Sequence, residues 1–133
     1  EVSRIRVLNY LSYLQKAQAL LLLDKEASGI KQLTKPEKIY LGNTNYAYAL
    51  GGEKTDIGNV RETFFFNQTA VKHKVTYSSQ IDFTLNETYN FEIGGKNKIQ
   101  KQLAGVENGY LALDNIEIGF NNEIPFWLFG LMY

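Results

Sequence analysis

The chain has 133 residues, 44% of them hydrophobic and 14% aromatic, which is enough apolar material for one folded domain with its own core. Basic and acidic residues number 14 each, so no overall charge would draw the chain to nucleic acid or to an anionic membrane. The sequence has no cysteine, which excludes disulfides, thiolate metal sites and cysteine nucleophiles and suits the cytoplasmic location that we expect.

The N-terminal part of the chain predicts a helix followed by a β-hairpin. Ser3 is a suitable N-cap, and apolar residues at helical spacing predict an amphipathic helix over residues 3–17. The leucine-rich run at 19–23 predicts a strand, and a turn-rich connection at 24–29 leads towards a returning strand at 38–41. The leucine run is far too short to span a bilayer, so we expect neither membrane insertion nor secretion.

The rest of the chain predicts an α/β core. A turn and a short helix are expected over residues 42–50. Asp56 or Asn59 can cap a longer helix that runs to about Val71, and its run Phe64-Phe65-Phe66 is expected in the core. This longer helix is the first element of the predicted core.

Several short strands follow that helix. Three are expected at about residues 74–79, 80–85 and 89–93. A helix near 97–104 and an apolar strand at 110–113 complete an αβββαβ order around a mixed central sheet. The apolar C-terminal tail is expected to pack down, with Pro125 blocking a regular central strand.

The second and third of these strands predict a hairpin with a three-residue loop at 86–88, because this register aligns both apolar rows. The expected opposed pairs are Ile81 with Ile93, Phe83 with Phe91, and Leu85 with Tyr89. The same register places Asp82 opposite Glu92 on the other face, with Cβ atoms roughly 4.5–5.5 Å apart. Two carboxylates that repel each other are thereby held together.

These carboxylates have a chemical and a plain interpretation. Oxygen ligands suit Mg²⁺ or Mn²⁺, and such an ion between Asp82 and Glu92 could activate water beside a phosphodiester. Glu62 on the opening helix and the lysines Lys96 and Lys98 could assist. The plain interpretation is a solvated sheet face on which Lys96 or Lys98 neutralises the two acids.

Basic residues near the two acids could contact nucleic acid. Lys96, Lys98 and Lys101 form a local basic stretch that could contact the phosphates of DNA, or could be an ordinary solvated helix face. His73 is the sequence's single histidine, so neither a catalytic triad nor a two-histidine metal site can be built.

The order of acids and lysine resembles the core of the PD-(D/E)XK nuclease superfamily, which is the restriction-endonuclease-like fold. The motif is Ile81-Asp82-Phe83 followed by Phe91-Glu92-Ile93-Gly94-Gly95-Lys96. In addition, the segments 35–41, 58–65 and 124–130 look like the C-terminal domain-of-unknown-function family attached to bacterial and archaeal AAA-type ATPases. The likeness spans about residues 3–133.

The resemblance implies a parent protein with a P-loop ATPase domain, of which this chain is the last part. Residues 1–42 would be the end of a winged-helix-like connector, and 43–133 the nuclease-like domain. Asp82 and Glu92 would be metal ligands, Glu62 an accessory ligand or water-orienting carboxylate, and Lys96 the cation that stabilises the transition state. The sequence departs from the superfamily in one respect, because the expected lysine two residues after the acid is Gly94.

The resemblance leaves two functions open. One is a DNA-associated or regulatory module whose metal-dependent phosphodiesterase activity is either retained or lost. The other is a non-catalytic module that docks on the ATPase domain through its N-terminal helix, hairpin and apolar tail. ATP binding by this chain is not expected, since Gly51-Gly52-Glu53-Lys54-Thr55 has glutamate where a phosphate-binding loop needs glycine. A small-molecule or glycan-binding role ranks last.

Overall fold

The N-terminal helix and hairpin form as the sequence predicts. In the computed structural model, which describes residues 2–25 and 35–132, helix α1 (Arg4–Lys16) begins where the hydroxyl of Ser3 accepts the N–H of Arg6 at 3.3 Å. Strands β1 (Leu20–Leu23) and β2 (Lys38–Leu41) pair antiparallel as a two-stranded sheet. The predicted connection at 24–29 falls largely outside the described residues.

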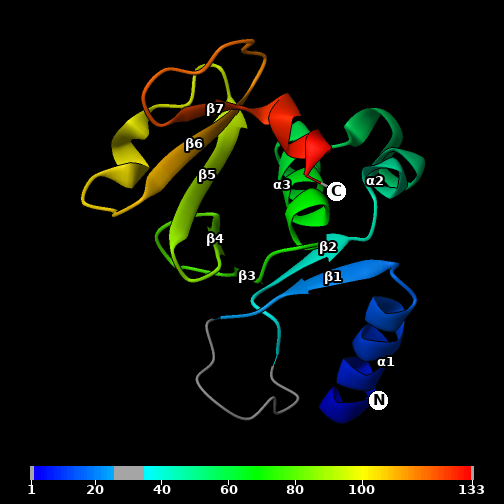
Figure 1. The fold of residues 1–133 in the computed structure, drawn as a ribbon. Helices are drawn as coiled ribbons and strands as arrows, with labels where there is room; N and C mark the ends of the chain where they lie inside the picture. The colour runs from blue at the N-terminus through cyan, green and yellow to red at the C-terminus, as the bar shows by residue number, and fades with distance from the viewer. Residues whose placement is uncertain (1, 26–34, 133) are drawn as a thin grey trace.

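Two helices lead into the core. Helix α2 (Thr44–Gly51) confirms the predicted short helix, and a 3-10 turn η1 (Gly52–Lys54) follows it. Helix α3 (Ile57–Thr69) begins where the carboxylate of Asp56 accepts the N–H groups of the next turn. It ends two residues before the predicted limit, and it is the long helix beside the sheet in Figure 1.

A five-stranded mixed sheet forms the centre of the fold. Its strands are β3 (Val75–Thr76), β4 (Phe83–Leu85), β5 (Tyr89–Gly95), β6 (Gly109–Asp114) and β7 (Glu123–Pro125). They lie in chain order, with β3–β4 and β4–β5 antiparallel and β5–β6 and β6–β7 parallel. The mixed central sheet and the pairs Phe83 with Phe91 and Leu85 with Tyr89 are confirmed. The predicted pair of Ile81 with Ile93 is wrong, because Ile81 precedes β4 and packs in a second apolar cluster with Leu103 and Leu111.

Three predicted elements differ from the structure. The strand expected at 74–79 covers only Val75–Thr76. The strand expected at 80–85 begins at Phe83, and just before it the side chain of Asp82 accepts the N–H of Ile93. The helix expected at 97–104 is only a 3-10 turn, η2 (Gln100–Leu103). Ile99 in front of it is extended, with φ −99° and ψ 152°, which prevents the helix from starting earlier.

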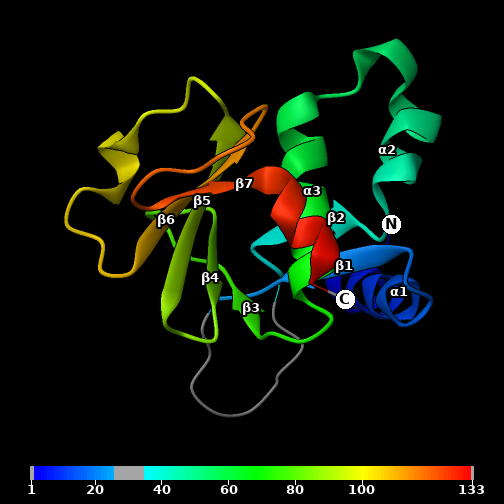
Figure 2. The ribbon, with the colours of Figure 1, turned by 45° about the horizontal axis from the view of Figure 1, so that its top comes forward.

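The aromatic residues pack on one face of the sheet. There α3 lies beside η3 (Phe126–Leu131), a 3-10 segment at the end of the chain (Figure 2). Phe65 of α3 is fully buried, and its ring centroid lies 5.2, 5.1 and 4.7 Å from those of Phe83, Phe91 and Phe129. The expected packing of the phenylalanine run and of the tail is confirmed for these buried rings, whereas Trp127 is exposed.

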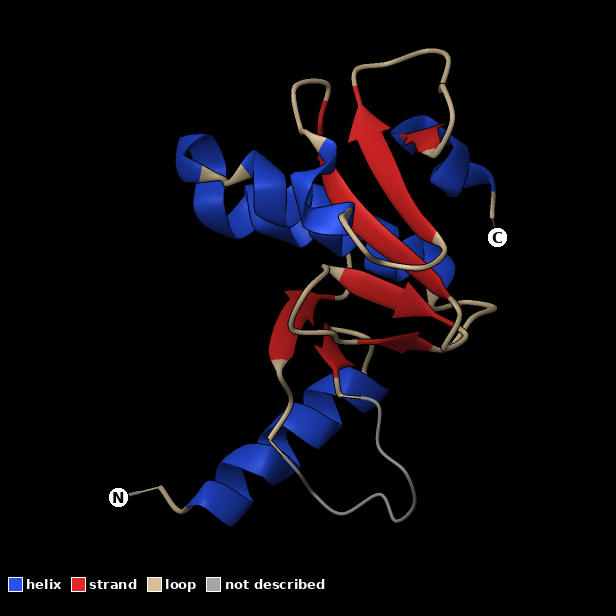
Figure 3. Ribbon diagram, turned by 90° about the vertical axis from the view of Figure 1, so that its left-hand side faces the viewer, coloured by secondary structure: helices blue, strands red, loops and turns tan. Residues whose placement is uncertain are grey.

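The N-terminal hairpin belongs to the same core. Leu23 of β1 and Tyr40 of β2 are buried in the cluster that contains Phe65, and the Tyr40 ring packs edge-on against Phe66 at 5.6 Å. Helix α1, by contrast, projects beyond the hairpin (Figure 3) and contains no buried residue. The domain boundary after residue 42 stays a prediction, although the hairpin on its N-terminal side and the sheet share one core.

Within residues 2–25 and 35–132, none of the helices combines the length and the apolar character needed to cross a lipid bilayer.

Candidate carboxylate and lysine site

Asp82 stands at the point where β4 begins. Its Oδ2 accepts the N–H of Ile93 at 2.9 Å, so the side chain takes the place of one backbone ladder bond. Its two oxygens face different cations: Oδ2 lies 3.4 Å from Nζ of Lys98, and Oδ1 lies 4.0 Å from Nζ of Lys38. Asp82 therefore joins the two halves of one charged cluster. The inner half contains Glu92 and Lys98, and the outer half contains Glu62 and Lys38.

Glu92 occupies the middle of β5, between β4 and β6. Phe91 and Ile93 on either side belong to the core under α3, so the side chain of Glu92 points to the opposite face of the sheet. The residue is 1% exposed. Burial raises the pKa of this carboxyl above its ordinary value, the Asp82 charge raises it further, and the nearby Lys98 opposes both effects.

Lys98 is the cation that meets these acids. Its Nζ lies 2.5 Å from Oε2 of Glu92, 2.8 Å from the carbonyl oxygen of Ile93 and 3.4 Å from Oδ2 of Asp82. The contact with Glu92 is therefore a short, buried ion pair. Burial lowers the pKa of Lys98, but Glu92 and Asp82 raise it by more, so its pKa lies above the ordinary value.

Gly94 makes room for this lysine. A Cβ at position 94 would lie 2.3 Å from Cδ and 2.7 Å from Cβ of Lys98, closer than real Cβ atoms approach. The stem of Lys98 therefore lies where a side chain at position 94 would begin. The departure from the superfamily pattern has a structural counterpart: position 94 carries no lysine, and a lysine four residues later returns its ammonium to the carboxylates.

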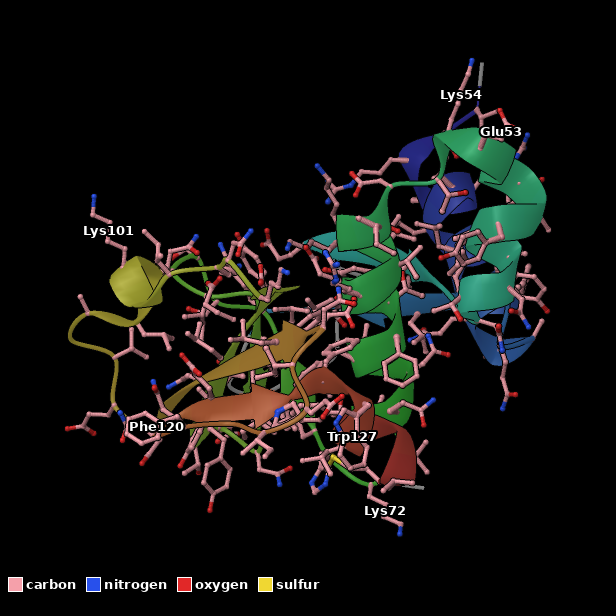
Figure 4. The ribbon with its side chains drawn as sticks, turned by 90° about the horizontal axis from the view of Figure 1, so that it is seen from above. Glu53, Lys54, Lys72, Lys101, Phe120 and Trp127 are labelled. Atoms are coloured by element: carbon pink, nitrogen blue, oxygen red, sulfur yellow. The ribbon has the colours of Figure 1, made fainter. Side chains whose placement is uncertain are left out.

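Lys96, to which the sequence assigned the role of the cation, lies exposed in the turn after β5. Lys101 is also exposed and points outward from η2, on the far side of the molecule from Lys54 (Figure 4). Lys98 instead turns inward, so the basic stretch predicted for DNA contact does not present its three ammonium groups on one face. The plain interpretation, in which Lys96 or Lys98 neutralises the two acids, is confirmed for Lys98.

Glu62 forms the outer half of the cluster with two residues of the hairpin. Its Oε2 accepts the hydroxyl of Tyr40 at 2.5 Å and the ammonium of Lys38 at 3.3 Å. Burial and the bond to Glu62 raise the pKa of the Tyr40 phenol above its ordinary value. Positions 38 and 40 are two residues apart on β2, so their side chains lie on the same side of the strand. This spacing can be read from the sequence.

Three oxygens of the cluster surround one position, which the ammonium of Lys98 fills. Across the described ranges, no three acidic, histidine or cysteine residues form a group that could hold a metal ion. However, Mg²⁺ is commonly bound by one or two carboxylates, with water and substrate phosphate as further ligands. The ammonium of Lys98 stands where oxygens of Asp82, Glu92 and the Ile93 carbonyl converge. Oxygen atoms of these kinds are the ligands that a small divalent ion prefers.

Comparison with known proteins adds no identification. No protein-family model matches this chain, no similar curated protein is found, and no similar solved structure is found. Membership of the ATPase-associated family therefore stays a prediction from the sequence.

Proposed function

We propose that this cluster is the metal-dependent phosphodiesterase site of a nuclease-like domain with a restriction-endonuclease-like core, acting on nucleic acid. The observation that carries the proposal is the convergence of three oxygens, from Asp82, Glu92 and the Ile93 carbonyl, on one cationic position. An ammonium group fills that position here, which shows that it favours positive charge. Hard oxygen ligands beside a fixed lysine are the parts that phosphodiester hydrolysis requires.

Each residue then has a defined task. Asp82 and Glu92 would hold Mg²⁺ or Mn²⁺, which when bound supplies charge stabilisation at the phosphate and lowers the pKa of water. Lys98 compensates the buried charge of Glu92, a task that the plain interpretation of the sequence gave to Lys96 or Lys98. Glu62, held through one oxygen by Tyr40 and Lys38, orients water on the outer side.

The charge of the cluster supports this assignment. When all are ionised, three carboxylates face two ammonium groups, which leaves one net negative charge. A divalent cation reverses this to one net positive charge, which suits a phosphodiester monoanion. Metal binding also favours the ionised form of Glu92, so we expect affinity for the ion to rise with pH.

The test is hydrolysis of bis(p-nitrophenyl) phosphate and of a labelled oligonucleotide, each with Mg²⁺ or Mn²⁺. Asp82→Asn keeps an acceptor for the Ile93 N–H but removes the charge, so we expect it to lower kcat by two orders of magnitude or more while the protein stays folded. Glu117→Gln, an exposed acid outside the cluster, is the matched control and should retain wild-type activity. Equal activity of wild type and Asp82→Asn would refute the proposal.

The proposed setting is the C-terminal part of an AAA-type ATPase in the cytoplasm, in which the ATPase domain is the partner. Support comes from the resemblance of the segments 35–41, 58–65 and 124–130 to the C-terminal family attached to AAA-type ATPases. In this setting the exposed Lys96 and Lys101 provide further contacts to DNA phosphates.

A second candidate function is docking without catalysis. The exposed apolar residues of α1 favour it, since Ile5 is 68% and Tyr13 61% exposed. The binding partner would be the ATPase domain that the resemblance implies. The double variant Ile5→Ser with Tyr13→Ser should then weaken the association of this chain with the ATPase domain in sedimentation-velocity experiments. Asp82→Ala should have no effect on this association or on the response to metal ions. Loss of metal response in Asp82→Ala would argue against this candidate.

A further inference from the structure

Two lysines lie within ion-pair distance of Asp82 in the described parts of the chain, and they are held very differently. Lys98 has short contacts with Glu92 and with the Ile93 carbonyl, and its side chain is 23% exposed. The ammonium of Lys38 lies 3.3 Å from Glu62 and 4.0 Å from Asp82, and its side chain is 35% exposed. Charge-assisted N–H···O bonds are usually about 2.7–2.9 Å long, so Lys38 is loosely held at the rim of the cluster.

A polar cavity begins next to this rim. The ammonium of Lys38 lies 5.9 Å from the ring centroid of Tyr77, and Tyr77 in turn lines an open cavity of about 430 Å³. Ser78, Ser79 and Thr84 line the same cavity together with one lysine, Lys25, and one acid, Glu87. Hydroxyls, lysines and a partly exposed aromatic ring are groups that bind phosphate, sugar and base along a nucleic-acid strand.

We propose that Lys38 is a phosphate-binding residue, and that the cavity beyond Tyr77 binds the adjoining part of a single-stranded nucleic acid. The inference rests on the proposed function, because it supplies the substrate path to that site. It also assigns the β1–β2 hairpin to substrate recognition, since Lys38 lies on β2 and its neighbour Tyr40 fixes the hairpin in the core. One ammonium then serves two states: it pairs with Glu62 and Asp82 in the free protein and with phosphate in the complex.

Binding is measured by fluorescence anisotropy of a labelled twelve-residue oligothymidylate, with Ca²⁺ in place of Mg²⁺, over a range of salt concentrations. Lys38→Met should weaken binding about fivefold to tenfold at low salt and reduce the slope of log K against log salt by about 0.7, the value for one phosphate on a single strand. Lys38→Arg should restore most of the affinity. Lys54→Met removes an exposed lysine on η1 and should have no effect on affinity.

A second pair of variants tests the cavity without touching the charged cluster. Ser79→Glu places a negative charge in the exposed wall of the cavity and should weaken binding about as much as Lys38→Met. Gln102→Glu adds the same charge on the exposed surface of η2 and should leave binding unchanged. Circular dichroism and thermal unfolding confirm that each variant is folded.

The outcomes separate this inference from the proposed function. A wild type that does not bind the oligonucleotide, or a Lys38→Met variant with unchanged affinity and salt slope, overturns the inference even where hydrolysis is observed. Lys38-dependent and Ser79-dependent binding without hydrolysis supports the strand path and rejects the phosphodiesterase. In an active protein, Lys38→Met should raise KM for the oligonucleotide with little change in kcat, whereas a merely structural role would lower stability and leave KM and the salt slope unchanged.

Discussion

The two halves of the charged cluster differ in burial, and the difference separates what is fixed from what can exchange. In the inner half, the almost fully buried Glu92 is compensated by the short ion pair with Lys98. In the outer half, the ion pair of Glu62 with Lys38 is longer and both side chains reach solvent. Buried charges cannot be left uncompensated, whereas exposed ones are screened by water. The inner half therefore preserves the site and the outer half can respond to a ligand.

The largest expected effect comes from removing the inner cation. Lys98→Met leaves Glu92 buried without its partner, and breaking a buried pair in this way costs about 3–5 kcal/mol. Lys38→Met in the outer half should cost no more than about 1 kcal/mol. Urea unfolding of the two variants measures both costs. The double variant Lys98→Met with Glu92→Leu should recover most of the loss, and equal costs for the two single variants would break the comparison.

Gly94→Ala should have the next largest effect, because the added methyl group overlaps the stem of Lys98. Forcing an extra methyl into such a place costs about 1–3 kcal/mol. Gly95→Ala is the control, since its Cβ would lie 3.6 Å from Arg61, an ordinary contact. In a Lys98→Ala background, Gly94→Ala should cost much less. A cost that is the same in both backgrounds would show that Lys98 does not require Gly94.

Tyr40→Phe tests the link between the hairpin and Glu62. It removes the hydroxyl that Glu62 accepts while keeping the buried ring, so we expect a loss of about 0.5–1.5 kcal/mol in the free energy of unfolding. Tyr46→Phe on α2 is exposed and should be neutral. A neutral Tyr40→Phe would mean that this bond contributes nothing to the attachment of the hairpin.

The smallest expected change concerns pH. The pKa of Glu92 is raised in the folded chain, so above its ordinary value of 4.5 the unfolded chain loses this proton first. The stability of the wild type should therefore fall relative to Glu92→Gln as pH rises from 4.5 through the folded pKa, and then level off. Urea unfolding at several pH values measures the gap. If the stability of the wild type instead rose relative to Glu92→Gln with rising pH, Lys98 would lower the pKa of Glu92 by more than burial raises it.

The sequence predicted the parts of this fold that depend on local pattern. The alternating aromatic residues around the loop at 86–88 were enough to set the β4–β5 register, and with it the approach of Asp82 to Glu92. The 3-10 turn at Gln100–Leu103 was predicted as a full helix, because helical composition gives no warning of the extended residue Ile99 in front of it.

The cations of the site depended on long-range geometry. Lys98 reaches Glu92 only because of the turn after Gly95 and the space above Gly94, neither of which follows from residue spacing. Lys38 and Tyr40 were missed because the hairpin was assigned to a separate connector, whereas it packs into the same core as α3. Side chains from distant segments meet only after that packing is known.

The most direct test of the central claim is a thermal-shift titration with Mg²⁺, Mn²⁺ and Ca²⁺ on the wild type, on Asp82→Asn and on the control Glu117→Gln. A ligand that binds the native state must raise its stability by mass action. The carboxylate site predicts a Tm that rises with Mn²⁺ concentration in the wild type and in the control, and a rise that is lost in Asp82→Asn. The same response in all three proteins, or none in any, would contradict a metal site at Asp82 and Glu92.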